Sequence, residues 1–171
     1  MWRTIADEAA RESPLWAEAL RPEPEREDVA VFSPLGNARF ALGIETIYEG
    51  YLLHYGRPRL FAPGTPERAL LLGDYLYAHG LVRIADEGEV APVADLADLI
   101  SVCAQLRADD GNGDGWAWAA TVALLGTDEL RAARSALREH GNAEPLEALA
   151  REAAGGPAVD DALGAHEARV R

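Results

Sequence analysis

Apolar residues recur three and four positions apart along almost the whole chain, and no stretch alternates with the period of two that a strand requires. The pattern predicts an all-α helical bundle. With 171 residues the chain can bury one core. We expect a single domain over 1–171: an N-terminal helix and acidic linker over 1–32, core helices over 33–154, and a weakly ordered or short helical tail over 155–171.

Cap residues followed by proline mark several expected helix starts. They occur at Ser13-Pro14, Ser33-Pro34 and Thr65-Pro66. The stretch from Arg21 to Asp28, with two prolines and mixed charges, is typical of a solvated linker. Together with the periodicity, these signals predict helices over 3–20 with a break at 13–14, over 33–55, from 65 onward, over 92–108, over 116–125, after a cap at 127–129, and over 144–154.

Five glycines fall on helical stripes in the middle of the chain. Gly36, Gly43 and Gly50 are seven residues apart on the expected 33–55 helix, and Gly73 and Gly80 are seven apart on the next one. A glycine within a helix costs about 1 kcal/mol relative to alanine, so such a stripe needs a packing reason. The spacing predicts two helices packed backbone to backbone, or against a helix of a partner.

Composition narrows the class of partner. The 29 acidic and 16 basic residues give a net charge of −13, which argues against nucleic acid because phosphates require a basic surface. No apolar run approaches the ~20 residues of a membrane span. The single cysteine, Cys103, excludes an internal disulfide and favours the cytoplasm, and its place in a helix predicts an inert core residue.

One loop has the beginning of a calcium-binding pattern. Asp110, Asn112 and Asp114 occupy positions one, three and five, and Gly115 occupies position six. Position twelve is Thr121, which cannot supply the bidentate carboxylate of such loops. Aspartate, asparagine and glycine are also the residues of an ordinary turn. Calcium binding at Asp110, Asn112 and Asp114 is therefore one alternative, and the scattered histidines predict no zinc site.

Asp74 is the acidic residue with the most apolar surroundings on its expected helix. Leucines, a tyrosine and an alanine lie three, four and seven positions away, so we expect a buried or partner-facing carboxylate that anchors structure and does not perform catalysis. The tyrosines share the same two helices and suit either an interface or the wall of a lipid-sized cavity. They are Tyr48, Tyr51, Tyr55, Tyr75 and Tyr77.

The stretch from Tyr51 to Arg83, YLLHYGRPRLFAPGTPERALLLGDYLYAHGLVR, resembles the trans-type polyprenyl diphosphate synthases. Their Arg-Gly-x-Pro loop corresponds to residues 56–59, and their Leu-x-Gly-Asp-Tyr/Phe-Leu signature to Leu71–Leu76. Where the family has Asp-Asp-x-x-Asp, this chain passes from His54 through Tyr55 to Gly56. Those aspartates would hold the magnesium ions that neutralise the leaving diphosphate, so their absence predicts no chain elongation by this chain alone.

Within that family the chain is most similar to the small, non-catalytic subunit of two-component hexaprenyl or heptaprenyl diphosphate synthases. The resemblance implies a truncated isoprenoid synthase fold, a catalytic partner chain that carries the magnesium, no cofactor here, and a part in setting product length. The implied partner is that chain or a second copy, with an isoprenoid as ligand. The expected interface or apolar pocket comprises Gly43, Tyr48, Gly50, Tyr51, Tyr55, Gly73, Asp74, Tyr77 and Gly80, with Arg57 and Arg59 as anion contacts.

Two other functions fit the residues. The first is a stand-alone helical binding protein or enzyme for an apolar ligand, with Asp74, His54, Arg57 and Arg59 around the mouth of a closed cavity lined by the tyrosines. The second is a small acidic helical protein with a weak calcium-binding loop at 110–115. The prenyl synthase subunit remains the first interpretation because it alone accounts for the Gly-Asp signature.

Overall fold

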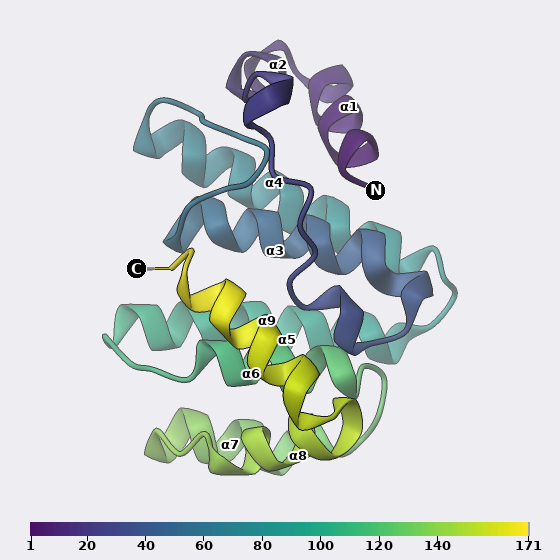
Figure 1. Cartoon of the computed structure of the whole chain (residues 1–171), viewed down its shortest axis with the longest axis vertical. Helices are drawn as coiled ribbons and strands as arrows, with labels where there is room; N and C mark the ends of the chain where they lie inside the picture. Colours follow the sequence, from purple (N-terminus) through teal and green to yellow (C-terminus); the bar gives the residue numbers. More distant parts are fainter. Residues whose placement is uncertain (171) are drawn as a thin grey trace.

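The computed structural model describes residues 1–170, and within them the chain is all helical with no strand, as expected. Three short 3₁₀ turns, η1 (Glu23–Glu25), η2 (Ser33–Leu35) and η3 (Ala38–Phe40), accompany the α-helices. The α-helices in Figure 1 are α1 (Trp2–Glu12), α2 (Pro14–Ala19), α3 (Ala41–Tyr55), α4 (Pro66–Ala85), α5 (Val90–Ala108), α6 (Asp114–Ala123), α7 (Leu130–His140), α8 (Glu144–Ala154) and α9 (Gly156–Glu167). No helix in this part of the chain is both long and apolar enough to cross a bilayer.

Helices α3 and α4 pack antiparallel at backbone distance, which confirms the interpretation of the glycine stripes. A Cβ added to Gly50 would lie 2.9 Å from the carbonyl oxygen of Gly73. One added to Gly80 would lie 3.0 Å from the carbonyl oxygen of Gly43. Any side chain at these four positions would push the helices apart, so the glycines are required by the approach of two helices of this same chain.

The expected start of the 33–55 helix was wrong. α3 begins at Ala41, and residues 33–40 form η2 and η3, because Asn37 accepts a hydrogen bond from the Arg39 amide and stabilises a separate turn. Gly36 is therefore not on the α3 stripe. Its backbone is extended, and an added Cβ would lie 2.5 Å from the carbonyl oxygen of Val122 on α6.

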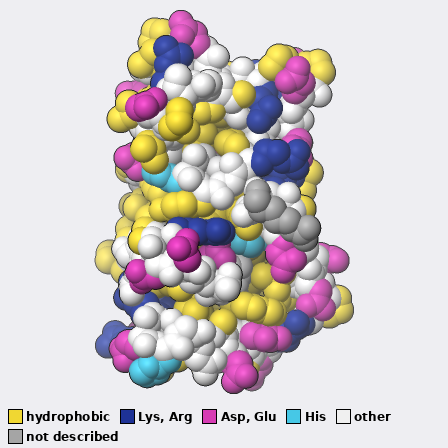
Figure 2. All heavy atoms as spheres, turned by 90° about the vertical axis from the view of Figure 1, so that its left-hand side faces the viewer, with side chains coloured by type: hydrophobic (Ala, Val, Ile, Leu, Met, Phe, Trp, Pro, Cys, Tyr) yellow, Lys and Arg dark blue, Asp and Glu magenta, His cyan; other side chains and the backbone are white. Residues whose placement is uncertain are grey.

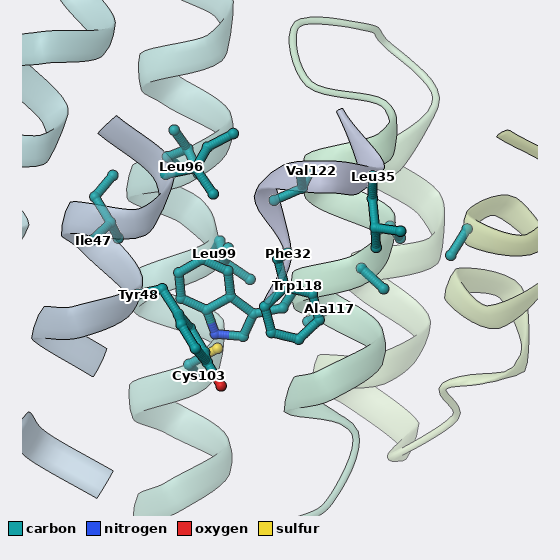
Figure 3. Close-up of a cluster of buried hydrophobic side chains, with 14 of the residues drawn as sticks. Phe32, Leu35, Ile47, Tyr48, Leu96, Leu99, Cys103, Ala117, Trp118 and Val122 are labelled. Carbon is teal, nitrogen blue, oxygen red and sulfur yellow. The ribbon is translucent and has the colours of Figure 1, made fainter. Parts of the chain in front are cut away.

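Two hydrophobic clusters hold the bundle together. The larger one joins α3, α5, α6, α8 and α9, and Figure 3 shows its aromatic centre, where Phe32 stacks on Trp118 at 5.5 Å between ring centroids. Tyr48 meets the same indole edge-on at 5.1 Å. Cys103 is buried there, and burial raises the pKa of its thiol, which fits the expected inert core residue. The smaller cluster seats α1 and α2 against α3, α4 and residues 60–61.

Of the two alternatives expected for the tail, the structure has the short helix. Residues 156–167 form α9, which packs on α6 and α8. Val159, Ala162 and His166 of α9 are buried. The amphipathic signal was weak because α9 buries alanine and histidine along with a single valine, so hydropathy alone understates its contact area.

Exchanging Gly50 for alanine tests the α3–α4 contact. Because the new Cβ meets a backbone carbonyl that cannot rotate away, we expect Gly50→Ala to lower the free energy of unfolding by about 1–3 kcal/mol. Gly164→Ala in α9 is the matched control, since an added Cβ there meets nothing within 4 Å. It should raise stability by about 0.5–1 kcal/mol. Urea unfolding measures both, and stabilisation by both variants would contradict the close approach.

Candidate functional site

A buried arginine lies at the junction of α3 with the segment that follows it. Arg59 has no exposed surface, and its guanidinium donates to Glu49 at 2.9 Å and to Glu45 at 2.5 Å. The same group lies over the rings of Trp2 at 4.6 Å and Tyr48 at 5.0 Å. The arrangement places one cation between two carboxylates and two aromatic rings, which is the environment that a buried charge requires.

The two glutamates also accept hydrogen bonds from backbone amides in the segments that precede and follow α3 in the chain. Glu45 Oε1 accepts from the amides of Val31 and Ser33, and Glu49 Oε1 accepts from the Leu60 amide. Burial alone would lower the pKa of Arg59, but the two carboxylates raise it, so the guanidinium stays charged. Neither glutamate could have been singled out from the sequence. Both stand among apolar residues of α3, and the arginine that pairs with them lies ten residues after Glu49 and fourteen residues after Glu45.

Arg59 is therefore not the anion contact that the sequence suggested. Its donors are taken up by protein oxygens, and no part of the side chain reaches solvent. Arg57, the other predicted anion contact, is 61% exposed at its side chain and lies 3.8 Å from Glu27. An anion could approach Arg57 only beside that carboxylate.

Removing the buried cation should destabilise the protein strongly. Arg59→Leu leaves two carboxylates without a partner in a dry site, for which we expect a loss of about 3–5 kcal/mol in the free energy of unfolding. Arg57→Leu, two residues away and exposed, should change it by less than about 0.5 kcal/mol. Chemical denaturation of both variants tests this, and equal small effects would show that the cluster does not stabilise the fold.

A second polar cluster joins α3, α5, α6 and α9. Asp114 accepts hydrogen bonds from the Tyr51 hydroxyl and, at 2.5 Å, from Arg107, which also donates to Tyr51 at 2.7 Å. His166 lies 3.5 Å from Asp114 through Nε2 and 3.0 Å from the Tyr48 hydroxyl through Nδ1. Burial acts to raise the pKa of Asp114, but His166, Tyr51 and Arg107 lower it well below its usual range. Asp114 is thus a fixed anion and a poor general base.

The same cluster bears on the calcium prediction. Asp114 is engaged by an arginine and a tyrosine, whereas Asn112 is exposed and Asp110, also exposed, has a positive φ of 51° in the turn. Among residues 1–170, no group of three or more histidine, cysteine, aspartate or glutamate side chains is arranged to hold a metal ion. The loop thus connects α5 to α6, and calcium binding there stays a prediction without further support.

The predicted pocket tyrosines divide between core and surface. Tyr48 and Tyr51 are fully buried and stack on each other, with ring centroids 5.9 Å apart. Tyr55 and Tyr77 are partly buried at the edge of the same cluster. Between α3 and α4 the glycine contacts leave no room for a ligand. The cavity expected for a stand-alone apolar-ligand protein is therefore not at that contact.

Asp74 is not buried, contrary to the first half of the prediction. Its side chain is 71% exposed, and it lies 3.2 Å from Nε2 of His54, which stacks on Tyr77 at 5.1 Å. Three of the apolar neighbours that suggested burial, Leu70, Leu71 and Ala78, are themselves exposed. The pKa of His54 is lowered by burial, against the opposing effect of Asp74. Whether Asp74 faces a partner stays a prediction.

The lowered pKa of His54 gives stability a pH dependence. An unfolded chain takes up a proton on this histidine near pH 6.5, whereas the folded chain resists it, so stability falls as the pH drops below about 6.5 and stops falling below the folded pKa. We expect His54→Gln to flatten the slope of unfolding free energy between pH 7 and pH 5. His140→Gln, at an exposed position, is the control. Equal slopes in wild type and His54→Gln would contradict this.

Helices α4 and α5 together leave an apolar surface uncovered. Four of the seven large exposed hydrophobic residues of the described chain lie here: Leu70, Leu71, Val82 and Val90. Figure 1 shows both helices on one side of the molecule, behind α3 and α6. We call this surface the α4/α5 face, and its exposed residues are Glu67, Leu70, Leu71, Asp74, Ala78, Val82 and Ala85 of α4, and Val90, Ala94, Ala97, Ser101, Ala104, Gln105 and Ala108 of α5.

Glu67 and Asp74 are the charged residues among these fourteen. The acids of α5, Asp95 and Asp98, point instead to Arg134 on α7, at 2.9 and 3.2 Å. The sequence analysis missed the α5 half of the face, although the spacing of Ala94, Ala97 and Ala104 is a helical stripe that could have shown it. An exposed stripe of alanines cannot be told from a buried one in the sequence, because only the surrounding fold decides whether the stripe is covered.

No family model, no curated protein and no solved structure matches this chain.

Proposed function

We propose that this chain is a non-catalytic subunit that acts by binding a partner protein through the α4/α5 face, and that the partner is a catalytic polyprenyl diphosphate synthase chain of isoprenoid biosynthesis in the cytoplasm. The observation that carries the proposal is the uncovered, largely apolar surface of α4 and α5, which has two carboxylates among its fourteen exposed residues. A contiguous apolar surface of this kind marks a protein interface more often than free surface.

The chemistry of the face supports a protein partner. The centres of interfaces are depleted of charge, and small residues on helices let a second helix approach closely. Leu71 and Val82 supply large apolar contacts, 60% and 55% exposed, while Ala94 and Ala97 leave a shallow surface beside them. The two carboxylates, Glu67 and Asp74, are available to basic residues or hydrogen-bond donors of the partner.

The class of partner comes from the resemblance of the Leu71–Leu76 signature, which lies on the same helix as the face. The position of the family's aspartate-rich motif corresponds here to the end of α3, where His54 and Tyr55 stand. Without carboxylates at that position, ionisation of an allylic diphosphate would depend on the partner's magnesium site. The role left to this chain is to stabilise the partner and to help set product length.

Light scattering of eluted complexes tests the assembly. The chain alone, a catalytic polyprenyl synthase chain from the same genome, and their mixture would be compared by size-exclusion chromatography, with synthase turnover measured in each. We expect a stable complex that turns over faster than the synthase alone, and no turnover by this chain. Ala97→Arg and Leu71→Asp should each weaken the complex at least tenfold, because they bury a charge at the interface.

Two matched control variants test whether the loss of binding is specific to the α4/α5 face. Ala132→Arg on α7 and Leu15→Asp on α2 are also exposed, but lie outside the α4/α5 face, and both should assemble as wild type does. If the chain alone forms a dimer and Ala97→Arg dissociates it, the partner at this face is a second copy of the chain and not a synthase. A chain that stays monomeric and does not bind the synthase would overturn the proposal.

A further inference from the structure

Asp74 lies on the α4/α5 face with a histidine against its carboxylate. Nε2 of His54, near the end of α3, is 3.2 Å from Oδ1 of Asp74. The Asp74 side chain is 71% exposed, whereas the His54 side chain is 10% exposed and its Nε2 is buried. Figure 2 views the side of the molecule on which α3 ends and α4 begins, and it shows a histidine side chain at the surface between hydrophobic ones.

Packing between α3 and α4 holds the His54 ring in this position. The ring stacks on Tyr77 with centroids 5.1 Å apart and meets Tyr55 at 5.5 Å. A Cβ at Gly73 would lie 2.5 Å from the His54 Nε2, so the ring occupies space that this glycine leaves open. These contacts keep Nε2 directed toward the carboxylate of Asp74.

The other groups around His54 do not compete with that carboxylate. Burial raises the pKa of the Tyr55 and Tyr77 hydroxyls, so both are neutral at pH 7. From α5, the buried thiol of Cys103 also has a raised pKa and is neutral. The guanidinium of Arg107 lies over the Tyr55 ring at 5.9 Å and acts on that tyrosine.

In the free chain, His54 is a neutral imidazole beside a solvated carboxylate. Burial lowers the pKa of His54 from its usual 6.5, against the opposing effect of Asp74. A partner seated on the face would take the water from Asp74, and a buried carboxylate without a counter-charge is strongly unfavourable. The same partner would take little water from His54, because that side chain is already nine-tenths shielded.

We propose that His54 takes up a proton when a partner covers Asp74, so that assembly through the α4/α5 face strengthens as the pH falls from 8 to 6. The protonated ring would donate a charge-assisted hydrogen bond to the covered carboxylate. This inference rests on the proposed function, since it requires a partner at the face. Glu67, the other carboxylate there, lies in the first turn of α4, where the helix favours its negative charge.

The expected direction is opposite to that of stability. Unfolding exposes His54 and lets it take up a proton, so a lower pH favours the unfolded chain. Assembly keeps the ring in place and gives it a counter-charge in a drier site, so a lower pH favours the complex. A pH effect on assembly therefore cannot be produced by the pH effect on folding.

Titration calorimetry of the full chain with the catalytic polyprenyl synthase chain, in phosphate and in Tris at pH 7, counts the protons taken up on binding. For a partner that is a second copy, dilution of the chain alone gives the same count. We expect wild type to take up at least about half a proton more than His54→Gln, which is about threefold in affinity per pH unit. His140→Gln, at an exposed position on α7, should behave as wild type does.

Asp74→Asn removes the carboxylate at an exposed position and should abolish the same pH dependence. It gives the comparison should His54→Gln not fold. A complex whose affinity has equal pH slopes in wild type and in the folded variants would overturn the proton uptake and leave the proposed function standing. Absence of a complex with the synthase or with a second copy would overturn both.

Imidazole chemical shifts of the free chain give a test without a partner. His54 should titrate below pH 6.5, and lower still in Asp74→Asn, because the variant loses the group that favours the imidazolium. A His54 that is already protonated at pH 7 in the free chain has no proton to take up on binding, and this result would overturn the inference whatever the synthase does.

Discussion

The salt-bridged Arg59 is the interaction on which the rest of the structure depends. Three charges lie without solvent at the centre of the molecule, and such a group persists only when each charge finds its partners in one geometry. Because Glu45 and Glu49 also bind amides at 31, 33 and 60, the cluster fixes both the segment that enters α3 and the segment that leaves it. The cluster therefore specifies where the N-terminal helices can dock.

The packing of the other elements around α3 explains why one side of α4 is exposed to solvent. The glycines at 50 and 73 bring α4 to backbone distance, so α4 fills the side of α3 that other helices leave free and turns its remaining surface outward. Helix α5 follows α4 and buries its leucines against α6, while its alanines stay outside. The α4/α5 face is thus a consequence of how tightly the inner faces pack.

Local signals in the sequence predicted local structure well. Thr65 and Pro66 predicted the start of α4, and the helix predicted over 144–154 has the bounds of α8. Such predictions succeed because a cap residue or a proline affects only the helical turn in which it lies. Apart from the α3–α4 contact, which the glycine stripes indicated, interactions between distant segments could not be predicted. The Asp114 partner Tyr51 lies 63 residues away. Asp74 shows the same limit, since apolar neighbours on a helix indicate a face and cannot say whether that face meets the core or solvent.

The charged groups inside the protein are held by partners from other elements of the fold. Arg59 and Asp114 are held by neighbours that fix their charge, so neither can exchange protons during a reaction at neutral pH. His166 is held in the same way, with Nδ1 3.0 Å from the Tyr48 hydroxyl and Nε2 3.5 Å from Asp114. These buried groups therefore join elements of the fold that lie far apart in the sequence.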